Sequence, residues 1–125
     1  MFISQEPLHD ALLAVKNLIK TPATWTTDFN AVASNGVPID PTDPDACRWC
    51  LLGAMIKVIA DATTDRADRA SLYDTIQIHL HNVADKLQWR NFFYLADIND
   101  RGGLDAVHQL LDAAIVELSP QQVVS

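Results

Sequence analysis

The segment from Cys50 to Ile59 is apolar on nearly every side, and it limits most strongly what this chain can fold into. A surface helix has one apolar stripe, whereas a helix without a polar face must be surrounded by other elements. Gly53 lies inside the segment and costs about 1 kcal/mol relative to alanine, which indicates that a neighbouring helix passes close to its backbone. We therefore expect a central helix enclosed by the rest of the chain.

The start of this central helix is predicted at Asp43-Pro44-Asp45-Ala46. Asp43 offers an N-cap carboxylate, and Pro44 suits the first helical position because its missing N–H would have no partner there. Asp45 adds a negative charge where the helix dipole is positive. We expect the helix to continue to about Ala62.

Apolar residues at three- and four-residue spacing predict further helices over 7–20, 66–88 and 104–118, and an aromatic-rich one over 89–98. Residues 76–81 also alternate as a half-buried strand would, but the helical pattern is longer and no partner strand is visible. The predicted fold class is therefore all-α, a compact bundle of about five helices without a sheet.

Residues 21–42 are predicted to form one long ordered loop, with a helical turn near 28–33 and a turn at Asn35-Gly36. We expect Trp25 and Phe29 to hold this loop against the core. The whole chain, 1–125, is predicted to be a single domain with its core in 7–118 and a frayed tail at 119–125.

Charge and hydropathy exclude several classes of function. The chain has 9 basic and 16 acidic residues and a net charge of -7, which argues against a nucleic-acid partner. No apolar run approaches the roughly 20 residues of a membrane span, and the N-terminus does not resemble a signal peptide. With two cysteines, the protein is expected to be cytoplasmic, with reduced thiols.

Cys47-Arg48-Trp49-Cys50 has the C-x-x-C spacing, which on a helix places both sulfurs on one face. A redox dithiol and a zinc site remain open, but Asp45 opposes thiolate formation at Cys47, and a second pair of ligands at metal spacing is absent. The preferred interpretation is two small buried side chains.

His79 and His81 would face the same way on a strand and could there bind a metal. On a helix their side chains diverge by about 200°, so the helix prediction favours two histidines at the surface or its boundary.

Two groups of polar side chains stand out in the predicted loops. Asp40, Asp43 and Asp45 form the first, and Asn99 and Asp100 form the second, just before the last helix. Such oxygen-rich loops could converge on Ca²⁺ or Mg²⁺, or supply an acid/base pair. The alternative is that they serve as caps and turns, which is the preferred interpretation.

The chain resembles a small bacterial and bacteriophage domain family of unassigned function over roughly residues 25–115. That family's pattern has an Asp-x-x-Ala-x-x-Trp-Cys-x-x-Gly-Ala core, and it usually has another residue where Cys47 stands. The resemblance implies no reaction, and it suggests a phage or mobile-element origin. The matching positions are Trp25, Gly36, Asp40, Asp43-Pro44-Asp45-Ala46, Trp49-Cys50, Gly53-Ala54 and Asn99-Asp100.

We expect this protein to act by protein–protein interaction, as an accessory or inhibitor factor that binds a host protein or a second copy of itself as a homodimer. Trp25, Trp49 and Trp89 are the expected anchors, because tryptophan is enriched in interface hot spots; the alternative is that all three are core residues. No cofactor or bound metal is expected. The second hypothesis is a small-ligand or metal-assisted enzyme that uses Asp43, Asp45, Asn99 and Asp100.

Overall fold

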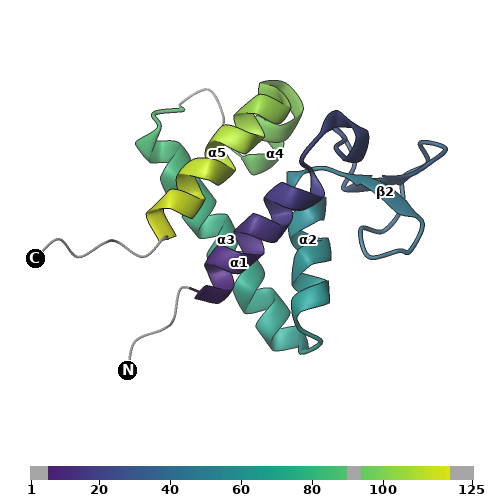
Figure 1. The fold of residues 1–125 in the computed structure, drawn as a ribbon, viewed down its shortest axis with the longest axis horizontal. Helices are drawn as coiled ribbons and strands as arrows, with labels where there is room; N and C mark the ends of the chain where they lie inside the picture. The colour runs from purple at the N-terminus through teal and green to yellow at the C-terminus, as the bar shows by residue number, and fades with distance from the viewer. Residues whose placement is uncertain (1–5, 90–93, 119–125) are drawn as a thin grey trace, which may run out of the picture.

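The computed structural model describes residues 6–89 and 94–118, and within them most of the chain is helical (Figure 1). The long helices α1, α2, α3 and α5 form the body of the molecule, and a small sheet lies to one side. The elements in chain order are α1 (Glu6–Leu18), η1 (Pro22–Thr24), β1 (Ala31–Ala33), β2 (Ala46–Trp49), α2 (Leu51–Ala62), α3 (Arg66–Lys86), α4 (Leu95–Asp97), the π-helix η2 (Ile98–Gly102) and α5 (Gly103–Leu118).

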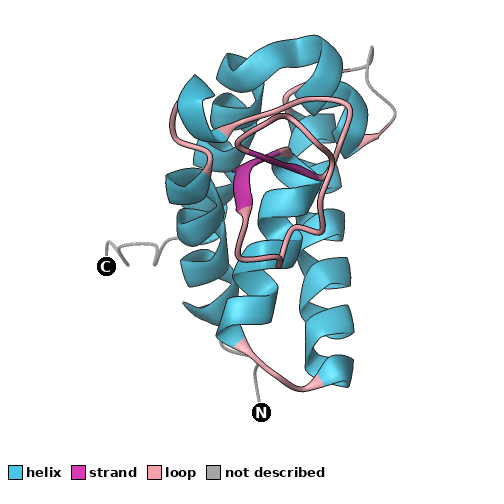
Figure 2. Ribbon diagram, turned by 90° about the vertical axis from the view of Figure 1, so that its right-hand side faces the viewer, coloured by secondary structure: helices cyan, strands magenta, loops and turns pink. Residues whose placement is uncertain are grey.

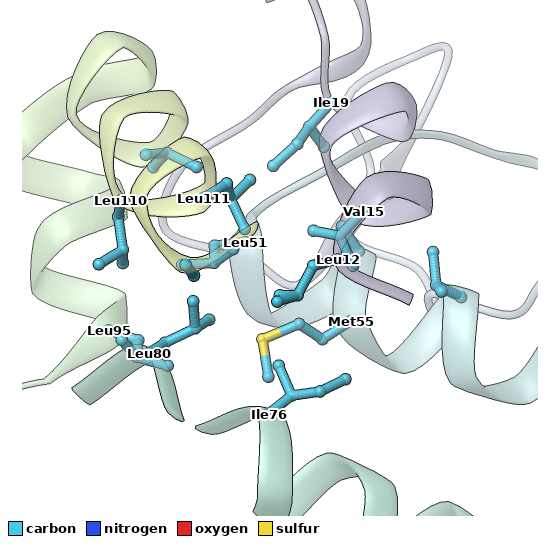
Figure 3. Packing of buried hydrophobic residues seen from close by; sticks show 14 of the residues in the cluster. Leu12, Val15, Ile19, Leu51, Met55, Ile76, Leu80, Leu95, Leu110 and Leu111 are labelled. Atoms are coloured by element: carbon cyan, nitrogen blue, oxygen red, sulfur yellow. The ribbon is translucent and has the colours of Figure 1, made fainter. Parts of the chain in front are cut away.

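One hydrophobic core joins the helices (Figure 3). Helix α2 packs against α1, α3 and α4, as expected of a central helix. Six of its twelve residues are buried and the other six are partly or fully exposed, so the rest of the chain does not enclose it on every side. Burial of large apolar side chains is the dominant favourable term in folding, at about 25 cal/mol per Å². Fully buried side chains come from every long helix, from α4 and from Ile19 just after α1. They are Leu12, Val15, Ile19, Leu51, Met55, Ile76, Leu80, Leu95, Leu110 and Leu111.

The helices predicted over 7–20, 66–88 and 104–118 are confirmed as α1, α3 and α5. His79 and His81 therefore lie on a helix, and both are partly exposed. The ring of His79 donates a hydrogen bond from Nε2 to the backbone oxygen of Ala114 (3.0 Å), so this side chain ties α3 to α5.

The prediction of a fold without a sheet is wrong, because β1 and β2 pair antiparallel with a bulge between Val32 and Ala33. Figure 2 shows this small sheet framed by loops on one side of the helices. The predicted helical turn near 28–33 is wrong for the same reason, since residues 31–33 are strand β1. Backbone bonds from Ala33 to Val37 and from Ile39 to Ala31 hold the other edge of β1.

The predicted helix start at Asp43 is also wrong. Asp43 and Pro44 begin a turn closed by a bond from Ala46 N to Asp43 O (3.0 Å), and strand β2 follows before α2 begins at Leu51. Aspartate at the first and proline at the second position are typical of a type I turn as well as of a helix start. Pairing of the next residues with β1 selects the turn.

The predicted helix over 89–98 is not formed as such. Trp89 is outside any helix, residues 90–93 lie outside the described ranges, and a short α4 leads into the π-helix η2. The predicted frayed tail at 119–125 also lies outside the described residues. No helix in the described ranges combines the length and apolarity that a bilayer crossing needs.

Gly53 makes the close approach that its position predicts, but the neighbour is not a helix. A Cβ at this position would lie 1.8 Å from the backbone oxygen of Asn30. The segment before β1 therefore lies directly on the first turn of α2, and a bond from Cys50 N to Asn30 O (3.1 Å) holds it there.

Candidate functional site

Asn99 is the buried polar residue of the described chain, with an exposed fraction of 1%. Its Oδ1 accepts hydrogen bonds from Trp25 Nε1 (2.8 Å) and from Leu51 N (2.9 Å). Its Nδ2 donates to Thr26 O (3.1 Å) and to Asp100 Oδ1 (2.9 Å). One side chain thus joins the loop after α1, the N-terminus of α2 and the π-helix η2, and its hydrogen-bonding capacity is used.

Asp100, the next residue, faces the same loop. Its Oδ1 accepts a bond from Asp28 N (3.1 Å). Asp28 has a φ of 72°, a backbone conformation that aspartate adopts more readily than most residues other than glycine. A π-helical turn is rare and often found at functional sites; here it places Asn99 and Asp100, which are adjacent in sequence, against one loop. In this chain both side chains hold that loop in place.

The two cysteines do not share a helix face, so that prediction is wrong. Cys47 is exposed on β2, and its thiol donates to Asp45 O (3.4 Å). Cys50 is buried and is the N-cap of α2, where its sulfur accepts a bond from Gly53 N (3.3 Å). The N-cap role predicted for Asp43 therefore belongs to Cys50.

Burial raises the pKa of the Cys50 thiol, and the nearby charge of Asp100 acts in the same direction. A reactive cysteine needs a lowered pKa and access to its target. Cys50 has neither, so its sulfur serves the helix cap.

The acidic residues before β2 shape the turns of the loop. Asp40 Oδ1 accepts bonds from Thr42 N (2.8 Å) and Thr42 Oγ1 (2.6 Å), and these bonds lower the pKa of Asp40. Asp43 Oδ1 accepts a bond from Asp45 N (2.8 Å), and the side chain of Asp45 is exposed. The turn interpretation therefore accounts for the bonds of Asp40 and Asp43.

The hydrogen bonds of the two acidic groups go to different parts of the fold. Those of Asp40 and Asp43 stay within residues 40–45, whereas those of Asn99 and Asp100 go to the loop at 25–28 and to Leu51. Within residues 6–89 and 94–118, no group of three or more His, Cys, Asp or Glu side chains is placed to hold a metal ion.

All three tryptophans contact the hydrophobic core, but only Trp49 is one of its buried residues, whereas Trp25 and Trp89 are partly buried against it. Trp49 is buried and donates from Nε1 to Pro41 O (3.0 Å), and Trp25 is bonded to Asn99. Trp89 is partly buried at the end of α3. Phe29, which we expected against the core, is 49% exposed.

A groove lies between the first half of α1, the end of α2 and the first half of α3. Figure 1 shows these three helix segments in its lower part. Its volume is about 1220 Å³. The floor is apolar, with Ala11 and Val58 buried and Leu8, Ala14 and Leu72 partly exposed. The rim carries the carboxylates of Asp10, Asp61 and Asp68.

Sequence reasoning missed this groove as a surface. The stripe of Leu8, Ala11 and Val15 on α1 correctly predicts a face turned toward other helices. It does not reveal that the N-terminal part of the stripe stays open while Val15 is buried. The available signal is the small size of Ala11 and Ala14, which fills less of the space between helices.

A second, smaller cavity of about 340 Å³ lies between α2, α3 and Thr42. Arg69 lines it, but its guanidinium donates to Thr63 O (2.7 Å) and Ala60 O (3.0 Å) and so caps the end of α2. Tyr73 also lines it, and burial raises the pKa of its hydroxyl. This cavity thus offers a half-buried phenol beside a guanidinium that is already bonded.

Comparison with known families decides the classification of the chain. The sequence model of a family of unknown function, DUF6197, matches residues 4–117. The chain belongs to this family. Membership in DUF6197 confirms the expected resemblance to a small domain family without an assigned function. No curated protein and no solved structure matches the chain.

Proposed function

We propose that this DUF6197 member is a protein-binding module that holds an amphipathic helix of another protein in the groove between α1, α2 and α3. The observation that carries this proposal is the groove itself, which has a volume of about 1220 Å³ and an apolar floor and is framed by three helices. Binding of an amphipathic helix in an apolar groove is a recurring mode of peptide recognition. The occupant supplies apolar side chains, and the floor removes them from water.

The length of the groove fits such a helix. Its wall on α1 extends from Pro7 to Ala14, and its wall on α3 from Asp68 to Thr75. Each wall covers seven helical steps, or about 10 Å at 1.5 Å per residue. Apolar anchors at positions i, i+3 or i+4, and i+7 of a partner helix cover the same distance. The groove therefore accommodates about two turns of a helix.

The second hypothesis, a ligand- or metal-assisted enzyme, has less support. Asn99 is buried with its hydrogen bonds directed at Trp25, Leu51 and Thr26. Side chains already committed to the fold are poor candidates for groups that must exchange protons or bind a ligand. The apolar groove instead favours binding over catalysis.

The experiment is a selection from a displayed library of peptides of about four helical turns, a length at which isolated helices begin to be stable. We expect selected peptides to shift amide resonances of residues that line the groove on α1, α2 and α3. Ala14→Trp fills the groove and should reduce their affinity at least tenfold. Leu13→Trp is the matched control, because Leu13 is the exposed neighbour on α1 and does not line the groove.

Three outcomes would overturn the proposal: no peptide is selected, the resonance shifts map outside the groove, or Ala14→Trp binds as tightly as Leu13→Trp. Contacts between Phe2 and Leu72 in nuclear Overhauser spectra of the free protein would also overturn it, because the chain would then fill its own groove. A concentration-dependent dimer that buries the groove would also overturn the proposal, because the occupant would then be a second copy of this chain and not another protein.

A further inference from the structure

The rim of the groove is acidic on all three helices. Asp10 lies on α1, Asp61 on α2 and Asp68 on α3, and all three side chains are exposed at the groove. No lysine or arginine is among the described residues that line it. A helix lying on the apolar floor therefore has a carboxylate from each wall within reach of its flanks.

The cations near this rim neutralise it only in part. Lys57 lies one turn before Asp61 on α2 and pairs with it at 3.2 Å. The ring of His9 lies 3.7 Å from Asp10, and it contributes a charge only when it is protonated. Asp68 lies in the first turn of α3, where the positive end of the helix dipole favours a carboxylate. Among the described residues, Asp10 and Asp68 have no lysine or arginine within ion-pair distance, so their negative charges are not paired with a permanent cation.

We propose that the groove selects an amphipathic helix whose apolar stripe is flanked by lysine or arginine, an inference that rests on the proposed function. Complementary charge at an interface rim steers association and discriminates between partners. The groove walls are about 10 Å long, close to the Debye length of about 8 Å at physiological ionic strength, so salt screens the rim acids only in part along a bound helix. A second copy of this chain is a poor occupant, because each copy carries a net charge of -7.

The test uses one selected peptide in three forms that share the apolar stripe and differ at the flanks: lysine, glutamine or glutamate. Their affinities are measured by fluorescence anisotropy at ionic strengths of about 0.01 M and 1 M. This increase in salt shortens the Debye length from roughly 30 to 3 Å. We expect the lysine form to bind about tenfold more tightly than the glutamine form at low salt, and the glutamate form to bind more weakly than both. The three affinities should converge at high salt.

Two triple variants test whether the rim carboxylates cause the preference for the lysine form. Asp10→Asn, Asp61→Asn and Asp68→Asn together remove the rim charges. The control combines Asp85→Asn, Asp105→Asn and Asp112→Asn, which changes the net charge equally and lies outside the groove. Asp105 is the control for Asp68, because both lie in the first turn of a helix. Asp112 is the control for Asp61, because each forms an ion pair with a lysine. We expect only the rim variant to lose the preference for lysine.

The outcomes separate the two proposals. If the glutamine and lysine forms bind the groove equally well, the charge inference is wrong and the binding function stands. If the control variant loses as much preference as the rim variant, general attraction to an acidic protein explains the result, and the inference is also wrong. If no form binds in the groove, the proposed function itself fails.

Discussion

The side-chain oxygen of Asn99 lies 2.9 Å from the backbone nitrogen of Leu51, although the two residues are 48 positions apart. The first N–H groups of a helix have no partner within the helix. Asn99 supplies one for the first residue of α2, and the same oxygen holds the indole of Trp25. The N-terminus of the central helix is therefore fixed by a residue from the π-helix η2.

Replacement of Asn99 should destabilise the protein strongly. Asn99→Leu leaves the N–H groups of Trp25 and Leu51 without their acceptor, and an unsatisfied buried donor costs about 1–3 kcal/mol each. We expect the free energy of unfolding to fall by roughly 2–5 kcal/mol in urea titrations. Asn82→Ala, at an exposed position on α3, is the control. A loss below about 1 kcal/mol would show that water replaces the missing acceptor.

Gly53→Ala should be destabilising although alanine favours helices. The added Cβ would meet the backbone oxygen of Asn30 at 1.8 Å, so the segment before β1 must move away from α2. We expect a loss of about 3 kcal/mol or more, well above the helix-propensity gain of about 1 kcal/mol. Gly36→Ala is the comparison, because its Cβ meets no atom within 4 Å. Its left-handed φ of 83° limits the cost to about 1–2 kcal/mol. Equal losses would contradict the packing argument.

The two thiols should differ in reactivity. Cys47 is exposed, whereas Cys50 is buried with a raised pKa. A thiol reagent such as dithionitrobenzoate should modify Cys47 at once, and Cys50 only when the protein opens. Mass spectrometry of native and urea-unfolded protein measures both sites. If Cys50 in the Cys47→Ser variant reacted as rapidly as Cys47 in the Cys50→Ser variant, the result would contradict the burial of Cys50.

Stability should fall in alkaline solution partly through Cys50. Its thiol ionises near pH 9.0 when exposed, and burial raises the pKa in the folded state. Above pH 9.0 the unfolded chain therefore holds fewer protons than the folded one, and the free energy of unfolding decreases as pH rises. Below that pH the contribution is complete. Unfolding curves should show a smaller alkaline loss for Cys50→Ser than for Cys47→Ser; identical slopes would rule out Cys50 as a contributor.

The helical part of the fold follows from periodicity. The stripes on α1, α3 and α5 repeat at three- and four-residue spacing, and the apolar run of α2 requires enclosure, so these elements could be predicted without tertiary information. The small sheet could not. Strands β1 and β2 have three and four residues, too short for an alternating pattern to emerge, and their pairing exists only once α2 supplies a surface.

In the candidate sites, too, the sequence predicts one part and the tertiary structure decides the other. Asp40, Asp43, Asn99 and Asp100 carry polar chemistry that the sequence displays, but their hydrogen-bond partners depend on which loops meet. The groove left no distinct signal, because its apolar floor continues the stripes that build the core and its rim carboxylates are spread over three helices. Whether Leu8 and Leu72 are covered depends on how far the neighbouring helices extend and at what angle they cross.

The sequence by itself determined that α2 is central, that three amphipathic helices accompany it and that Gly53 touches a neighbouring backbone, because spacing and side-chain volume are local properties. Tertiary structure decided what touches Gly53, which residue caps α2 and whether Asp43-Pro44 starts a turn or a helix. These choices lie between local conformations of similar energy, and contacts between residues far apart in the chain select among them.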